Sequence, residues 1–543
     1  MSDRRRFWLI PTLAIGGGLL LAATQTGAAG SPSAAEAGGT FNVSFMATAF
    51  DHVDPALSFS AEGWALLDAT CTRLMTYPDK APPEGLRVVP EVATGYPRIS
   101  SDAKTYTFTL RKGFRFSDGT PVEASAFARA INRTLAPGVI SGGAQFTQAI
   151  VGAGAVQSGK SAAAAGVVAS GNRLVVRFTR PVLDFPAQTT MPFFCAVPPT
   201  LPSDPEGVGA FPGSGPYFIS EYIRGQRVVL ERNRFYRGTR PHHVDRFAVD
   251  LQAGTPQEVL DRIEGGRADW GLIPPLLYFD PARGLVRKYG VNRSQFFVKP
   301  GLVLRGWALN SSRPLFRDNV KLRRAVNFAL DRRALVRAAG SPLAGRPTDQ
   351  YLPPAVPGFK DQDIYPLTRP NVQKARALAR GQTRSGKAVL YTFDVPFLLA
   401  SAQIVKQNLK KIGLEVEVKS LPSPAAFRLT IRPGAPVDIA YSPWIADYVD
   451  PYQYANILFD GRFIGESNLA HFNSPRYNAL LRRAARLQGD ARYRAYGQLD
   501  VQLARDAAPI AAVAHDNQET LVSSRVGCIV LRPLLDLTAA CLK

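Results

Sequence analysis

Residues 213–238 read GSGPYFISEYIRGQRVVLERNRFYRG, and they are the most informative part of the chain. The glycine, serine and proline residues at the start of this stretch are typical of a chain break. Tyr217 to Ile223 is rich in aromatic and β-branched residues, Arg224-Gly225-Gln226 is typical of a turn, and Arg227 to Glu231 extends again. The pattern predicts a β-hairpin followed by an aromatic and basic segment.

The first 37 residues have the three parts of an export signal. Arg4-Arg5-Arg6 is basic, Phe7 to Ala23 is mostly apolar, and Ala35-Glu36-Ala37 fits a cleavage site. We therefore expect an exported protein, in the periplasm or at the outer face of the cytoplasmic membrane. The alternative is an uncleaved anchor, although the apolar run is shorter than the roughly 20 residues that a membrane helix needs. Arg4-Arg5-Arg6-Phe7 also fits R-R-x-F, the core of a twin-arginine signal, so that export route stays open as well.

Size and charge restrict the class of protein. The roughly 500 residues that remain after cleavage exceed the roughly 250–300 that one hydrophobic core serves, so we expect at least two lobes. The chain holds 65 Lys and Arg against 43 Asp and Glu, a net charge of +22. These basic residues are scattered along the chain, whereas nucleic-acid binders gather them on one face. We expect a basic, solvated surface and no nucleic-acid partner; attraction to an anionic membrane or an acidic partner is the alternative.

The four cysteines favour disulfides, because an even and small number in an exported chain is typical of them. Cys528 and Cys541 bracket a short C-terminal segment and are the first choice for a pair, which leaves Cys71 with Cys195. Four cysteines allow three pairings, and the sequence does not choose among them. No cysteine lies near the cleavage region, so we do not expect a lipid-anchored protein.

Hydrophobic periodicity predicts an α/β pattern in the second half of the chain. Asp318 to Ala339 is predicted to form one helix, and Leu414 to Val418 alternates as a half-buried strand should. Earlier in the chain, Thr120 to Glu123 (TPVE) has the composition of a capping box, which predicts that a helix starts there.

Several separate blocks resemble the extracytoplasmic solute-binding proteins of ABC importers, in the peptide/nickel family (family 5). The stretch 213–238 itself resembles that family's G-[ST]-G-P-Y hairpin followed by LERN-x-x-Y-x-G. Further similar blocks, in the family's order, are YTFTLRKGFRFSDGTPVEASAFARAINR (106–133), SSRPLFRDNVKLRRAVNFALDRRALV (311–336), YLPPAVPGF (351–359), VDIAYSPWIADYVDP (437–451) and FNSPRYNALLRRA (472–484).

The resemblance implies a fold and its boundaries. The fold is an α/β, two-lobed clamshell of the type II periplasmic-binding class, with an extra β-rich domain and a hinge that closes on ligand. The implied division, after the signal at 1–37, is lobe I at 38–60, 205–300 and 506–543, the extra domain at 61–204 and lobe II at 301–505.

The resemblance also implies ligand-binding residues. In peptide-binding relatives the Asp of W-x-A-D-Y takes the ligand's α-ammonium, which corresponds here to Asp447, with Trp444 and Tyr448 as neighbours able to stack on ligand side chains. Asp447 has alternative roles, as a turn cap or as the partner of an arginine, and the two aromatics have an alternative role as packing. Strand edges near Met46, Ala47, Tyr441 and Ser442 are candidates for main-chain hydrogen bonds with an extended peptide. Trp64 and Trp307 are weaker candidates, because tryptophans of this kind lie more often in a core than in a cleft.

The predicted function is the substrate-binding component of an ABC transporter, which captures peptides or similar small solutes and presents them to a permease. The same fold with another solute, such as an opine, a sugar, glutathione or a metal chelate, is the first alternative, and an exported hydrolase is the second. No sequence motif supports a catalytic site, so we expect no enzyme and no cofactor. His242-His243 does not predict a metal site, because neighbouring residues on a strand face opposite ways. We expect a monomer.

Overall fold

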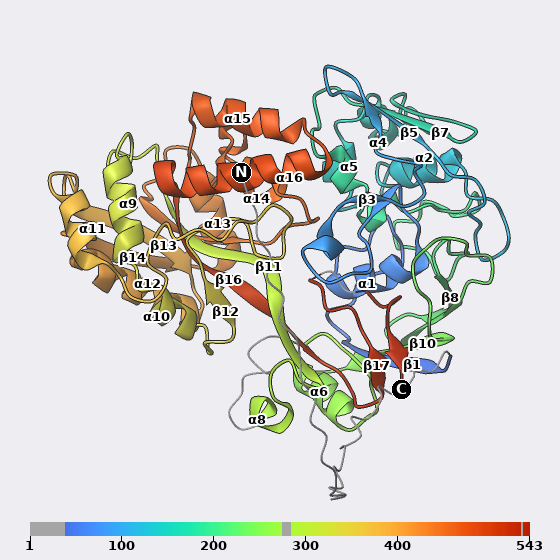
Figure 1. Cartoon of the computed structure of the whole chain (residues 1–543). Helices are drawn as coiled ribbons and strands as arrows, with labels where there is room; N and C mark the ends of the chain where they lie inside the picture. The colour runs from blue at the N-terminus through green and yellow to red at the C-terminus, as the bar shows by residue number, and fades with distance from the viewer. Residues whose placement is uncertain (1–37, 274–283, 534–535) are drawn as a thin grey trace, which may run out of the picture. The chain divides into compact units, whose positions relative to one another are not determined.

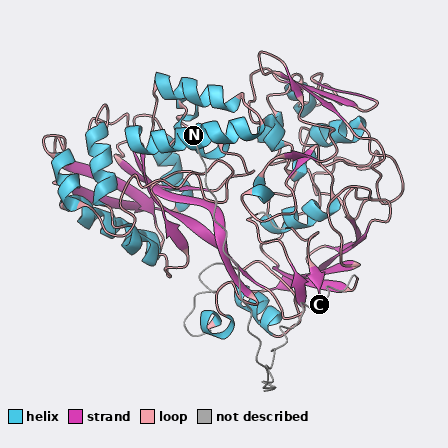
Figure 2. Cartoon of the chain, viewed as in Figure 1, coloured by secondary structure: helices cyan, strands magenta, loops and turns pink. Residues whose placement is uncertain are grey.

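The computed structural model describes residues 38–273, 284–533 and 536–543. The export signal predicted for residues 1–37 lies outside these residues. In the described part of the chain, no helix combines the length and the apolar character that a membrane span needs. Helices and strands are mixed throughout, and three larger sheets organise the chain (Figures 1 and 2).

The first sheet contains the N-terminal strand and the predicted hairpin. Its strand order is β1 (Thr40–Met46), β10 (Arg246–Ala253), β9 (Arg227–Arg232) and β8 (Tyr217–Ile223). β8 and β9 pair antiparallel, so the hairpin prediction is confirmed. β1 pairs with β10 in parallel, which brings together residues about 200 positions apart in sequence.

The second sheet is mixed and has six strands. Their order is β12 (Gly345–Pro347), β16 (Ile510–Leu521), β11 (Phe296–Leu309), β15 (Ile439–Trp444), β13 (Lys387–Phe393) and β14 (Glu415–Leu421). β13 is parallel to β14 and β15, whereas β11 is antiparallel to both of its neighbours. The half-buried strand predicted at 414–418 is therefore confirmed as β14.

Strands β11 and β16 extend beyond the six-stranded sheet toward the first one. They pair from Phe296 with Leu521 up to Ala308 with Ile510, and Val522 then forms a bridge with Trp270. Trp270 in turn bridges Val43 of β1. This two-stranded ribbon of β11 and β16 therefore connects the two sheets, as the long green-yellow and red strands show in Figure 1.

The segment between β1 and β8 carries the third sheet. Its strand order is β4 (Arg98–Ile99), β5 (Thr105–Thr109), β7 (Arg173–Arg177) and β6 (Val167–Ser170). Two further pairs of short strands are β2 (Met75–Thr76) with β3 (Val89–Pro90), and β17 (Val526–Cys528) with β18 (Cys541–Leu542).

Helices surround these sheets. Those of the first half are α1 (Ala61–Thr70), α2 (Ala124–Arg133), α3 (Ala144–Thr147), α4 (Ala153–Gln157), α5 (Phe185–Gln188), α6 (Pro256–Glu264) and α8 (Leu285–Tyr289). Those of the second half are α9 (Val320–Ala329), α10 (Arg332–Arg337), α11 (Val372–Ala379), α12 (Pro396–Lys410), α13 (Ser423–Ile431), α14 (Tyr452–Phe459), α15 (Pro475–Ala485) and α16 (Gly489–Gln502), the last continuing as a π-helix over Leu503–Ala507. Short 3₁₀ turns cover Glu84–Leu86, Pro192–Phe194 and Gly461–Phe463.

Two helix predictions are wrong in detail. The single helix expected over 318–339 is two helices, because Asp331 accepts a hydrogen bond from the backbone N–H of Ala334 and starts α10 anew. The helix expected from Thr120 begins at Ala124, because the Thr120 carbonyl accepts a hydrogen bond from the Phe116 N–H in a preceding turn.

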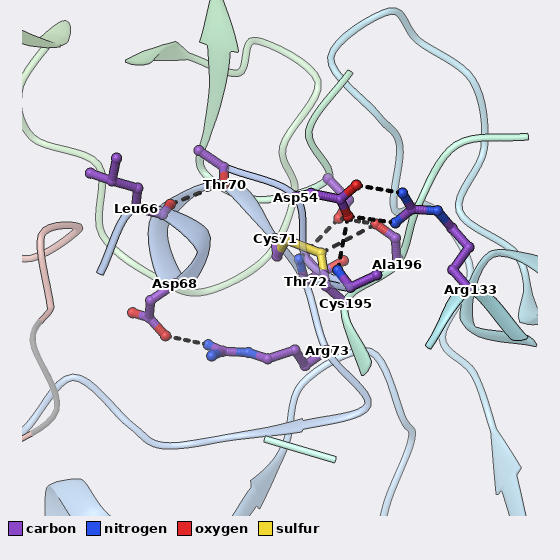
Figure 3. The surroundings of a disulfide bond; sticks show 12 residues. Asp54, Leu66, Asp68, Thr70, Cys71, Thr72, Arg73, Arg133, Cys195 and Ala196 are labelled. Atoms are coloured by element: carbon purple, nitrogen blue, oxygen red, sulfur yellow. Dashed lines mark hydrogen bonds and ion pairs between the residues drawn. A yellow bond between two sulfur atoms is a disulfide. The ribbon is translucent and has the colours of Figure 1, made fainter. Parts of the chain in front are cut away.

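Two disulfides join the four cysteines, in the pairing that the sequence analysis ranks first. Cys71, at the end of α1, is bonded to Cys195, with 5.5 Å between their Cα atoms. Figure 3 shows this bond near Arg133, whose guanidinium donates two hydrogen bonds to the buried carboxylate of Asp54, at 2.8 and 2.7 Å. Cys528 is bonded to Cys541, with 4.9 Å between Cα atoms, and joins β17 to β18.

Candidate functional site

A cavity of about 570 Å³ lies beside the ribbon of β11 and β16. Its walls come from α1, from the turn at 190–192, from β11 and β16, and from the segment that follows β15. The apolar lining includes Phe59, Trp64, Leu272, Leu302 and Ile445, and the charged lining consists of Asp68, Arg73, Asp447, Glu519 and Arg532. A mostly apolar hollow with a few polar groups has the size and character of a small-molecule site.

Asp447 lines this cavity, in the segment that joins β15 to α14. No hydrogen bond or ion pair reaches its carboxylate from any described residue. Burial raises the pKa of Asp447, because the ionised form loses hydration without gaining a partner. The side chain is therefore available to a cation, since neither a turn N–H nor an arginine, the two alternatives that the sequence left open, occupies it.

Tyr448 also lines the cavity, but its hydroxyl is already bonded. It is 2% exposed and donates a hydrogen bond to the carboxylate of Asp184, which precedes α5. Burial and the nearby Asp184 raise the pKa of Tyr448 well above its ordinary value. Tyr448 therefore forms part of the wall and holds it in place.

The other five predicted site residues do not line the cavity. Tyr441 is buried, with edge-to-face contacts to Trp307 and Phe393, and Ser442 is buried beside it. Trp444 packs against the main hydrophobic core, and its indole N–H finds no acceptor among the described residues.

At the end of β1, Met46 packs on a hydrophobic cluster formed around α6. The backbone N–H of Ala47 already donates to the carbonyl of Ala253, at 2.9 Å. Neither residue lines the cavity, so the main-chain contacts expected here and at residues 441–442 are absent from its described lining.

The structure adds Trp64 and Glu519, among others, to the predicted site residues. Trp64, a weaker candidate in the sequence analysis, lines the cavity and packs against Phe59, with ring centroids 5.7 Å apart; Trp307 is buried as expected. Glu519 also lines the cavity, and it is 7% exposed. The available signal for Glu519 was the change within Ile510–Leu521 (IAAVAHDNQETL) from an apolar strand to a polar one.

The arginines of the wall belong to a buried ionic cluster. Arg73 lies 2.5 Å from Asp68, and Arg532 lies 2.9 Å from Asp536. Behind them, a third guanidinium, Arg240, lies 2.9 Å from Glu91. Both arginines among the described lining residues therefore have a carboxylate partner.

The cluster also contains two neighbouring carboxyl groups, those of Asp79 and Asp536. Burial, together with the nearby Asp536, raises the pKa of Asp79 to about 8, while the pKa of Asp536 is lowered because Arg532 favours its ionised form. The pair therefore holds one proton up to near-neutral pH, which lowers the negative charge opposite the arginines.

Comparison with known proteins gives this cavity its context. Residues 87–465 match the family described as bacterial extracellular solute-binding proteins, family 5. The periplasmic oligopeptide-binding protein OppA of Escherichia coli (strain K12) is 25% identical over 461 residues, which cover 81% of each chain. The probable D,D-dipeptide-binding periplasmic protein DdpA of the same organism is 25% identical over 500 residues, covering 89% of this chain and 90% of that protein.

Solved structures agree with the fold. The clavulanic acid biosynthesis oligopeptide binding protein 2 superposes with a TM-score of 0.77 at 26% identity, over 93% of this chain and 96% of the other. The unliganded open form of the murein tripeptide binding protein MppA also gives 0.77, at 20% identity, and it supports the fold alone. The match covers more than half of the chain, the predicted two-lobed α/β fold is confirmed, and the protein is a member of the family 5 bacterial extracellular solute-binding proteins.

Proposed function

We propose that this protein captures peptides outside the cytoplasm and delivers them to an ABC permease. The observation that carries the proposal is the unpartnered carboxylate of Asp447 in a cavity of about 570 Å³. The relatives named for oligopeptides and for D,D-dipeptides support the choice of peptides within the solute-binding class.

Asp447 would receive the α-ammonium of the peptide. A carboxylate that has lost water without gaining a partner regains that stabilisation when a cation binds, and a hydrogen bond to a charged group contributes roughly 1.5–3 kcal/mol. The apolar lining around Phe59 and Ile445 would receive side chains with little discrimination among them. This combination fits a binder that holds many peptides by one common group.

The ribbon of β11 and β16 is the proposed hinge. It connects the six-stranded sheet of lobe II, proposed at 301–505, with the sheet of lobe I, proposed at 38–60, 205–300 and 506–543. Residues 61–204 would form the extra domain. Closure around ligand by bending of a few residues in such connectors is a common motion of two-lobed binders.

The proposal assigns no catalysis to this protein and treats it as a monomer. In support, neither a histidine nor a cysteine is among the described residues that line the cavity, so the lining offers no imidazole base or thiol nucleophile. The bond that Tyr448 donates to Asp184 also keeps its phenol from acting on a ligand.

Native mass spectrometry of the purified protein, followed by calorimetry with a tripeptide library, tests the function. We expect a retained or added peptide that binds one to one and is recovered intact. The matched control is each peptide with an acetylated N-terminus, which keeps the side chains and removes the α-ammonium. Binding to neither set would overturn the peptide proposal, cleavage of the bound peptide would overturn its non-catalytic part, and equal binding to both sets would remove the role of Asp447.

A further inference from the structure

Among the described residues of the cavity wall, the ionisable side chains without an opposite charge are both acidic, although the chain as a whole carries +22. Arg73 and Arg532 are neutralised by Asp68 and Asp536. Among the described lining residues, Asp447 and Glu519 are the charged side chains for which no opposite charge is found. The open part of the site is therefore acidic and carries two groups rather than one.

Glu519 has the features of a ligand-binding group. Its side chain is buried, with 7% of the residue's surface exposed, and its Oε1 has no hydrogen-bond partner among the described residues. Burial raises the pKa of Glu519 to about 8, with a smaller contribution from Asp516 on the same strand. A buried carboxylate without a partner is costly, which is why it is found mainly where a ligand or a partner supplies the missing contact.

The two carboxylates line the same cavity and come from segments on either side of β11. β15 and β16 flank β11 on either side, and Trp444 and His515 lie opposite the same residue, Leu304. Both strands run in the same direction. Glu519 lies four residues beyond that level on β16, whereas β15 ends at Trp444 and Asp447 follows it in the segment that leads to α14. With strands about 4.8 Å apart, β15 and β16 are on the order of 10 Å apart across β11, and this spacing sets the scale of the distance between the two acidic groups.

We propose that the ligand carries two cationic groups joined by an apolar spacer, one held by Asp447 and the other by Glu519. This inference rests on the proposed function and makes it narrower: the peptide has lysine or arginine as its first residue. An extended basic side chain, with a contact of about 2.8 Å at each end, covers a distance of this order. A free diamine has the same chemistry, and the experiment separates the two sources.

The apolar lining of the cavity suits such a spacer. Phe59 and Ile445 line the cavity and remain 48% and 65% exposed, although both are large and apolar. Trp64 adds an aromatic face beside Phe59. Aliphatic stems of lysine and arginine cover apolar surface while their charged ends stay with polar partners, and an aromatic face attracts the cation further.

Calorimetry with Lys-Ala-Ala and norleucine-Ala-Ala tests the inference, because norleucine keeps the aliphatic stem and removes the second charge. We expect the lysine peptide to bind about ten- to a hundredfold more tightly, which is the usual effect of one charge-assisted hydrogen bond. In Glu519→Gln this difference is expected to disappear, whereas norleucine-Ala-Ala keeps its affinity within about twofold. Cadaverine is the probe for a free diamine.

The control variant is Glu231→Gln, which removes the same charge from an exposed position on β9 and is expected to bind both peptides like the original protein. If both peptides bind equally, the second cation site is overturned while peptide capture stands. If neither peptide binds but cadaverine binds and loses affinity in Glu519→Gln, the dicationic site stands and peptide capture fails. If no probe binds, both proposals are overturned.

Discussion

The hydroxyl of Tyr448 donates a hydrogen bond to the carboxylate of Asp184, and this bond joins two segments that lie 264 residues apart in sequence. Asp447, the preceding residue, has no such partner among the described residues. Two neighbouring side chains of one loop therefore have different roles: Tyr448 fixes the wall of the cavity, and Asp447 remains free to bind. The position of the free carboxylate depends on the bond made by its neighbour.

Replacing Asp447 by Asn is expected to weaken peptide binding about ten- to a hundredfold, because the amide is nearly isosteric but carries no charge for the α-ammonium. Calorimetry with one tripeptide measures this loss. Asp394→Asn, which changes an exposed aspartate outside the cavity lining, is the control and should bind normally. Unchanged affinity in Asp447→Asn would contradict the assigned role.

Replacing Tyr448 by Phe is expected to lower the free energy of unfolding by about 1–3 kcal/mol, because the buried carboxylate of Asp184 loses a donor and keeps the one from Gln188, at 3.0 Å. Urea denaturation followed by circular dichroism measures the change. Tyr391→Phe, at a half-buried tyrosine of β13 that does not line the cavity, also removes a hydroxyl and is expected to cost much less. Equal losses of unfolding free energy in the two variants would show that the hydrogen bond to Asp184 does not stabilise the fold.

The two disulfides are expected to differ in their effect on stability. The bond between Cys71 and Cys195 closes a loop with a sequence separation of 124, whereas the bond between Cys528 and Cys541 closes one of 13. Because each bond lowers the entropy of the unfolded chain, the first is expected to add about 5 kcal/mol to the free energy of unfolding and the second about 3 kcal/mol. Thermal unfolding of the two double-alanine variants should therefore show the larger drop for Cys71 and Cys195, and the reverse order would contradict this account.

The stability of Glu519→Gln relative to the original protein is expected to increase as the pH rises. Burial raises the folded-state pKa of Glu519 from about 4.5 to about 8, with Asp516 contributing. Below pH 4 the carboxyl is protonated in both folded and unfolded chains, and between pH 4 and 8 the folded state loses stability as the pH rises. The melting temperature of the variant, compared with that of the original protein, should therefore increase from pH 4 to pH 8 and then level off. A difference that decreases over this range would be inconsistent with a buried, unpartnered Glu519.

Local patterns predicted the parts of the fold that depend on nearby residues. The hairpin of β8 and β9 follows from runs of aromatic and β-branched residues and a glycine turn, and both are local properties. The second of the two helices, α10, is held in place by Arg332, whose buried guanidinium donates to the carbonyls of Thr348 and Ala512, at 2.8 and 2.9 Å. Those acceptors come from other parts of the chain, so the sequence around Arg332 could not reveal them.

The sequence also predicted only those parts of the site that depend on nearby residues. Asp447 was found because it lies in a recognisable W-x-A-D-Y segment, and the structure places it in the cavity. Glu519 was missed because its position depends on the register of β16 against β11, a pairing between residues more than 200 positions apart. Trp444 and Tyr441 were overestimated because an aromatic residue beside a binding motif has the same sequence signature whether it packs inward or lines a cavity.

Strand β16 lies between two other strands of its sheet, although it is synthesised near the end of the chain. It lies between β12 and β11, and the residue after it bridges to Trp270 beside the N-terminal strand. A ribosome must therefore reach residue 521 before the six-stranded sheet can be completed, and most of the polypeptide is synthesised before β16 is available. Late closure of this kind prolongs the time in which the nascent chain stays unfolded, exposes apolar surface and remains accessible to chaperones.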